Sequence, residues 1–166
     1  MTPNQGDYIW IHLTPNEVAA AANHATIRRL GHLNGASKDR HRLPERDSRR
    51  DDLDNDVQSC AAELAFAKYI GEYWGGITEK WAPETKWGEV RWVRENHHGL
   101  IINPDDDDRR RFVLMDGFAP DFRIVGWMYG YEAKQKGQWT QDTYWLAPRC
   151  DIWKFKARTY QEEKER

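Results

Sequence analysis

The segment from Val57 to Ile70 constrains the fold more than any other part of the chain. Candidate helix caps lie at 54–56 and Gly71 follows the segment, so we predict a helix between them. Most of the circumference of this helix is apolar, and small residues dominate it, at Ala61, Ala62, Ala65 and Ala67. Such a helix can only be stable when it is buried on several sides, and its small side chains predict close packing against a sheet.

Glu63 lies in the middle of this apolar helix, and its neighbours within one turn include Cys60, Phe66 and Ala67. A buried carboxylate is costly unless an arginine, a backbone donor or a metal ion pairs with it. Two readings therefore stand side by side. Glu63 is either half of a structural ion pair or part of a functional site.

A second candidate for function is the strand that we predict at Trp87–Val93. Side chains on a strand alternate between its faces, so Glu89 and Arg91 are expected on the same face as Trp87 and Val93. A carboxylate beside a cation can hold a metal ion next to a phosphate oxygen, although such pairs are also common on ordinary strands. Glu84 follows a proline on the approach to this strand. Carboxylates from three separate segments would suit Mg²⁺ or Mn²⁺.

The remaining pattern predicts helices and strands in an α/β order. Thr14 and Glu17 form a capping box with Pro15 at the first helical position, and the helix that they start is expected to end near residue 30, with Gly31 as its stop. A short strand is expected before it, at 8–13. Beyond residue 87 we predict a hairpin of 100–103 with 111–115, a strand at 122–129, a short helix at 131–135 and a last strand at 144–148.

Residues 34–56 lack apolar periodicity and mix positive with negative charges, so we predict a charged loop. Loops of this length are often functional or mobile. It is either a solvated loop or a basic arm that becomes ordered on nucleic-acid phosphates. The candidate nucleic-acid-binding residues of that arm are Arg40, Arg42, Arg46, Arg49 and Arg50.

Composition and charge exclude several classes of protein. Nine tryptophans argue against a disordered chain, and no apolar run is long enough to cross a membrane. A net charge of −2 provides no general attraction to nucleic acid. Cys60 and Cys150 are isolated, which favours buried thiols in a reducing cytoplasm. The N-terminal residues lack the pattern of a secretory signal, so we expect a cytoplasmic protein.

Other candidate motifs carry little weight. The sequence has neither a Gly-rich phosphate loop nor a Gly-x-Ser-x-Gly elbow, so neither P-loop nor serine-hydrolase chemistry is expected. The acidic and basic run at 105–111 lacks the spacing of a calcium loop, and we expect a solvated turn there.

A helix with one buried glutamate, an acidic residue after a proline and a Glu-x-basic strand together resemble the PD-(D/E)XK nuclease superfamily. The stretches 61–68, 89–91, 99–102 and 122–127 are similar to small phage-encoded proteins of that type, over roughly residues 57–148. The resemblance implies an α/β fold with a restriction-endonuclease-like core, in which helices flank a central mixed sheet. We therefore expect one domain, with an N-terminal strand and helix extension at 1–33, the charged loop at 34–56, the nuclease-like core at 57–155 and a frayed tail at 156–166.

The resemblance also implies an activity, namely a metal-dependent phosphodiesterase that cleaves DNA with metal-activated water. Glu63, Glu84 and Glu89 would correspond to the carboxylates around Mg²⁺ or Mn²⁺, and Arg91 would replace the lysine of the family. Two departures matter. Glu84 stands where the family has aspartate, and Arg91 stays protonated, so it can bind a phosphate but cannot act as a base.

These departures leave a second hypothesis open. The chain would then be a catalytically inactive nuclease-like fold that binds DNA or a protein partner, which would be a host protein if the chain is phage-encoded. In that case the protein would work in the cytoplasm of the host cell. The sequence is also compatible with a homodimer, and it gives no reason to expect a membrane partner.

Overall fold

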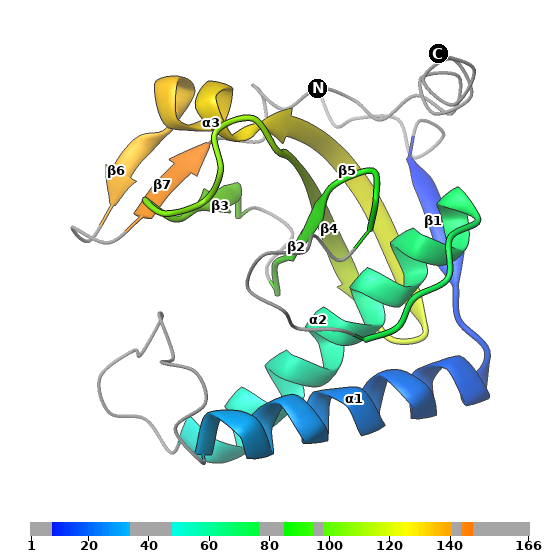
Figure 1. Cartoon of the computed structure of the whole chain (residues 1–166). Helices are drawn as coiled ribbons and strands as arrows, with labels where there is room; N and C mark the ends of the chain where they lie inside the picture. Colours follow the sequence, from blue (N-terminus) through cyan, green and yellow to red (C-terminus); the bar gives the residue numbers. More distant parts are fainter. Residues whose placement is uncertain (1–7, 34–47, 77–84, 95–97, 141–143, 148–166) are drawn as a thin grey trace.

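The computed structural model describes residues 8–33, 48–76, 85–94, 98–140 and 144–147, and these form a layered α/β fold (Figure 1). One long helix packs against one side of a four-stranded sheet and a second long helix packs on the first, while a smaller sheet with a short helix lies on the other side. In chain order the elements are β1 (Ile9–His12), α1 (Pro15–Leu33), α2 (Ser48–Ile70), β2 (Glu89–Trp92), β3 (Leu100–Ile102), β4 (Arg111–Phe118), β5 (Asp121–Tyr129), α3 (Gly130–Lys136), β6 (Gln138–Thr140) and β7 (Tyr144–Ala147).

The central sheet is mixed, as the sequence led us to expect. Its strand order is β1-β5-β4-β2, with β2 parallel to β4 and the other neighbours antiparallel. The three-stranded sheet has the order β3-β7-β6 and is antiparallel. Because β1 is an edge strand of this sheet, the N-terminal strand is part of the four-stranded sheet.

The central strand β4 is buried on both faces of the sheet. Val113 and Met115 point into a core shared with α2, whereas Phe112 and Leu114 point into a second core on the opposite face. The second core is closed by residues of β3, α3 and β7. A strand that is apolar on both faces suits a central position with a layer on each side.

Two local signals at the helix ends, the capping box at Thr14 and the stop at Gly71, behave as predicted. The Thr14 backbone N–H donates to Glu17 Oε2 over 2.7 Å, and the Glu17 N–H donates to Thr14 Oγ1 over 3.3 Å, which is the predicted capping box. Lys68 of α2 also bonds Glu17 over 2.8 Å, and this bond, together with the capping bonds, lowers the pKa of Glu17. Gly71 ends α2 with a φ of 72°, a conformation that glycine adopts without strain.

The helix boundaries differ from the predictions at two places. The first helix does not stop at Gly31 but continues to Leu33, since one glycine costs a helix only about 1 kcal/mol. The predicted loop at 34–56 is wrong for residues 48–56, which form the first turns of α2. Tertiary ion pairs favour this longer helix, because Asp56 bonds Arg29 of α1 over 2.7 Å.

The predicted hairpin between 100–103 and 111–115 is also wrong. The two strands belong to different sheets, since β3 pairs with β7 while β4 pairs with β2 and β5. The strand β6 was not predicted at all. The strand predicted from Trp87 begins only at Glu89, because the Thr85 hydroxyl closes a turn with Gly88 through bonds of 2.8 and 3.1 Å. The Trp87 ring consequently joins the core on the α2 side.

Among the described residues, none of the helices combines the length and the apolar character that a membrane span requires. Residues 1–7, 34–47, 77–84, 95–97, 141–143 and 148–166 lie outside the described part of the chain. The expectations for the basic arm, for Glu84, for Cys150 and for the C-terminal tail fall wholly or partly within these ranges.

The capping box gives a test of the first helix. Replacing Thr14 with alanine removes the side-chain bond to the Glu17 N–H, so we expect the free energy of unfolding to fall by about 1 kcal/mol in urea titrations. Thr26→Ala is the matched control, because the Thr26 hydroxyl only bonds the carbonyl of Ala22 within the same helix. That control should be neutral or slightly stabilising. Equal losses in the two variants would contradict the capping role.

Candidate functional site

Glu63 forms a buried ion pair with Arg28, which we call the Arg28–Glu63 pair. Arg28 Nη1 lies 2.8 Å from Glu63 Oε1 and Arg28 Nη2 lies 2.6 Å from Oε2, so the contact is bidentate. The indole N–H of Trp74 also donates to Oε2, over 3.2 Å. Only 7% of the Glu63 side chain and 13% of the Arg28 side chain are exposed. The pair therefore ties α1, α2 and the segment after α2 together inside the protein.

Cys60 lies one helical turn from Glu63 and is fully buried. Burial, with a smaller contribution from the Glu63 charge, raises the pKa of the Cys60 thiol to about 12. The thiol is consequently protonated at neutral pH and is a poor nucleophile. Cys60 is a buried thiol, as the sequence indicated.

On the other side of the sheet, four charged residues form what we call the Arg91 cluster: Glu89, Arg91, Asp106 and Arg110. Arg91 Nη2 lies 3.1 Å from Glu89 Oε2 and 3.0 Å from Asp106 Oδ2. Arg110 bonds the other oxygen of Glu89. The Arg91 guanidinium also lies over the ring of Phe112, 5.0 Å from its centroid. The two carboxylates are thus brought together around one arginine nitrogen.

The turn between β3 and β4 places Asp106 in this cluster. The backbone N–H of Asn103 donates to Asp106 Oδ2 over 2.7 Å, and the Asp106 N–H returns a bond to the Asn103 carbonyl over 3.1 Å. Lys134 of α3 holds the turn from outside, because its Nζ donates to the carbonyl oxygens of Pro104 and Asp106 over 3.3 and 3.0 Å. Several independent bonds therefore determine the position of Asp106.

Sequence reasoning missed Asp106 and Arg110, because it assigned the whole run 105–111 to a solvated turn. That expectation is right for Arg109, whose side chain is 92% exposed, and wrong for Asp106, whose side chain is 9% exposed. The missed signal is the Asn103-Pro104 pair followed by an aspartate three residues after Asn103. Asparagine, proline and aspartate at such spacing favour a turn closed by a side chain, which directs one acid inward.

Of the three carboxylates singled out in the sequence, the two that the structure describes, Glu63 and Glu89, lie in different environments. Val90 and Trp92 pack in the core on the α2 side, so Glu89 and Arg91, which alternate with them, point to the opposite face of the sheet. Glu63 belongs to the α2 side and is bonded to Arg28. The structure therefore brings Glu89 and Arg91 together, as predicted, and does not bring Glu63 to them.

The other candidate residues fall outside what the structure describes. Glu84 lies within 77–84, and Arg40, Arg42 and Arg46 lie within 34–47. Arg49 and Arg50 belong to the first turns of α2, but their side chains are not among those described. The roles predicted for these six residues remain predictions.

A three-carboxylate metal centre is not assembled within the described part of the chain. No group of three histidine, cysteine, aspartate or glutamate side chains there is arranged to hold a metal ion. Glu89 and Asp106 nevertheless offer two carboxylates at one place, each within about 3 Å of the same nitrogen. Mg²⁺ is commonly held by one or two carboxylates together with waters and substrate phosphates.

Compared with protein-family models, with curated proteins and with solved structures, the chain matches none. The function therefore has to be argued from the geometry of the side chains. Two groups of charged side chains differ in burial. The Arg28–Glu63 pair is enclosed, whereas the Arg91 cluster is more accessible, with 23% of the Arg91 side chain and 28% of the Arg110 side chain exposed.

The Arg28–Glu63 pair predicts a large stability effect. Glu63→Ala leaves the Arg28 guanidinium without its carboxylate partner in the interior, so we expect the free energy of unfolding to fall by about 3–5 kcal/mol. Asp54→Ala removes the partner of Arg94 in an exposed ion pair and should cost only about 0–1 kcal/mol. Chemical denaturation of both variants measures the difference. A small loss in Glu63→Ala would contradict the structural role of the pair.

Proposed function

We propose that this chain is a metal-dependent phosphodiesterase that cleaves DNA, on a restriction-endonuclease-like fold, with the Arg91 cluster as its catalytic centre. The observation that carries the proposal is the position of Arg91 Nη2, which is 3.1 Å from Glu89 and 3.0 Å from Asp106. Two carboxylates and a permanently charged phosphate ligand thus converge at one edge strand of the sheet. The Glu-x-Arg spacing on that strand agrees with the superfamily that the sequence resembles.

In this proposal each residue of the cluster has a definite task. Glu89 and Asp106 would hold Mg²⁺ or Mn²⁺, which supplies a hydroxide by lowering the pKa of a bound water. Arg91 and Arg110 would bind the phosphate and stabilise the negative charge that develops on it. Arg91 takes no proton from water, because a guanidinium stays protonated at neutral pH.

The proposal changes the ligand set that the family resemblance implies. Glu63 becomes a residue that stabilises the fold, since its side chain is only 7% exposed and lies on the α2 side of the sheet, away from Glu89 and Arg91. Asp106 takes the place that the sequence had given to Glu63. Glu84 remains a candidate third carboxylate, because it lies five residues before Glu89 along the chain.

A second candidate function is a nuclease-like domain that binds DNA without cutting it. One observation favours it: both oxygens of Glu89 are engaged by arginines, Oε1 by Arg110 and Oε2 by Arg91. A carboxylate whose two oxygens are both paired with arginines can have a purely structural role and need not hold a metal ion. DNA binding that survives the loss of Glu89, with no cleavage by the wild-type protein, would be the expected result.

The decisive assay incubates the purified protein with plasmid, linear duplex and single-stranded DNA in Mg²⁺ or in Mn²⁺. We expect cleavage by the wild-type protein, with a rate that falls about 100-fold or more in Glu89→Gln and in Asp106→Asn. Asp54→Asn, in an exposed pair away from the cluster, should keep full activity. Wild-type protein that cuts no better than Glu89→Gln would refute the enzyme and leave the binding module.

A further inference from the structure

A second arginine-centred feature lies on the central sheet, where β1 pairs with β5. We call it the Trp10 shelf, and it consists of Tyr8, Trp10 and Arg123. The Arg123 guanidinium carbon lies 4.5 Å from the centroid of the Tyr8 ring and 5.7 Å from that of Trp10. The Trp10 residue is 57% exposed, which is unusual for so large an apolar side chain. Its ring therefore contributes little to the core, unlike its neighbour Ile11.

The carboxylate of Asp116 fixes the position of the Arg123 guanidinium. Its Nε and Nη2 donate to the two oxygens of this carboxylate over 2.8 and 2.6 Å. Asp116 is only 2% exposed, and its bonds raise the pKa of Arg123, so the guanidinium stays charged. The third nitrogen, Nη1, donates to no side chain or carbonyl within the described residues. The shelf thus combines an exposed aromatic ring with a fixed cation, and Nη1 of that cation is available to donate hydrogen bonds to a ligand.

The strand register places the Trp10 shelf on the same face of the sheet as the Arg91 cluster. Trp10 is opposite Arg123, and Arg123 is opposite Asp116, which lies two residues beyond Leu114 on β4. Leu114 in turn is opposite Arg91 on β2. Three strand spacings and a step of two residues separate Trp10 from Arg91, which corresponds to about 16 Å between their backbones.

The chemistry of the shelf defines its ligand. A flat ring can stack on an exposed tryptophan, and an anion can accept hydrogen bonds from an arginine. The ligand should therefore carry a flat ring and an anionic group close to each other. A nucleotide unit has this combination. Duplex DNA does not present the faces of its bases, because they are stacked on one another, whereas a single strand does.

We propose that the Trp10 shelf binds single-stranded nucleic acid, with a base stacked on Trp10 and a phosphate oxygen accepting hydrogen bonds from Arg123 Nη1. The role of this binding rests on the proposed function, since the bound strand would extend toward the Arg91 cluster and be cut there. Binding at the shelf needs neither the metal nor cleavage. The two proposals can therefore fail separately.

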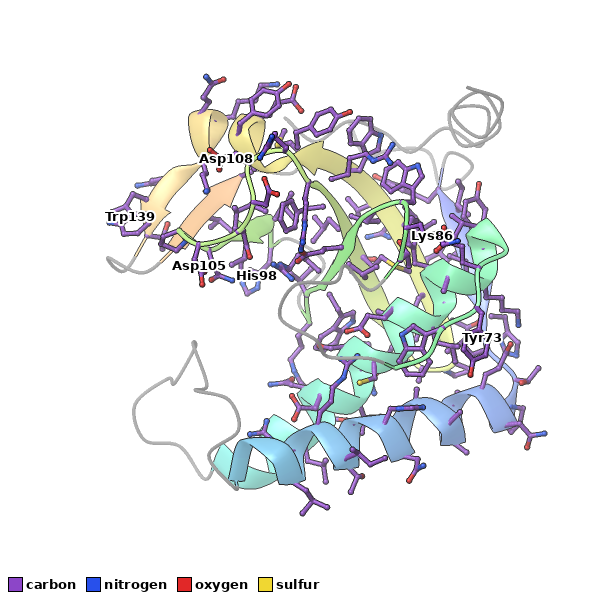
Figure 2. All side chains as sticks on the ribbon, in the orientation of Figure 1. Tyr73, Lys86, His98, Asp105, Asp108 and Trp139 are labelled. Atoms are coloured by element: carbon purple, nitrogen blue, oxygen red, sulfur yellow. The ribbon has the colours of Figure 1, made fainter. Side chains whose placement is uncertain are left out.

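Fluorescence anisotropy of a labelled oligothymidylate tests this binding in EDTA, where cleavage cannot occur. Because stacking on one aromatic ring is worth roughly 5- to 150-fold in affinity, Trp10→Ala should weaken binding by that factor, and Trp10→Phe should weaken it less. Trp139→Ala is the matched control, since Trp139 is 39% exposed on β6, on the far side of the smaller sheet (Figure 2). An abasic oligomer of equal length should bind the wild-type protein as weakly as thymidylate binds Trp10→Ala.

Three outcomes would overturn the proposal. The first is wild-type protein that does not bind oligothymidylate, and the second is equal affinity of the wild-type protein for the abasic oligomer. The third is an equal loss of affinity in Trp10→Ala and Trp139→Ala. A wild-type dimer that Trp10→Ala converts to a monomer, measured by sedimentation, would instead assign the shelf to a second copy of the chain. None of these results depends on whether the protein cuts DNA.

Discussion

The bidentate bond between Arg28 and Glu63 is the interaction on which the layered structure depends. The small side chains of α2 allow the sheet to pack closely on one side of the helix, and Phe66 reaches Trp87 across that interface. Such a buried helix can contain Glu63 only because α1 supplies a guanidinium to it. The first helix is therefore a structural requirement of the second. Together they leave the opposite face of the sheet for other charged groups.

That opposite face carries both features to which we assign function. In the Arg91 cluster, partly exposed arginines bond two largely buried carboxylates, which come from an edge strand and a well-ordered turn. In the Trp10 shelf, a buried carboxylate orients one arginine beneath an exposed ring. Both use arginine with carboxylate, as the Arg28–Glu63 pair does. The difference lies in exposure, since 23% of the Arg91 side chain, 28% of the Arg110 side chain and 57% of Trp10 are exposed, against 13% of the Arg28 side chain.

Local signals predicted much of this fold, and long-range pairing accounts for most of what they missed. The capping box at Thr14, the stop at Gly71 and the shared face of Glu89 and Arg91 all follow from near neighbours in sequence. The partner of Glu63 could not be deduced, because Arg28 lies 35 residues away in the sequence. The apolar face of α2 around Glu63 indicates only that the carboxylate needs some partner. Asp106 was missed for a different, local reason, since acidic runs usually remain in solvent and the turn signal at Asn103-Pro104 was overlooked.

We propose that Glu89 and Asp106, rather than Glu63, form the metal-binding pair of this protein. Thermal unfolding with and without Mn²⁺ tests it most directly, because a ligand bound only to the folded state raises its stability. At saturating Mn²⁺ we predict that the melting temperature of the wild-type protein rises by about 5–10 °C, with no rise in Glu89→Gln or Asp106→Asn. An unchanged wild-type melting temperature, or an equal rise in all three proteins, would contradict the claim.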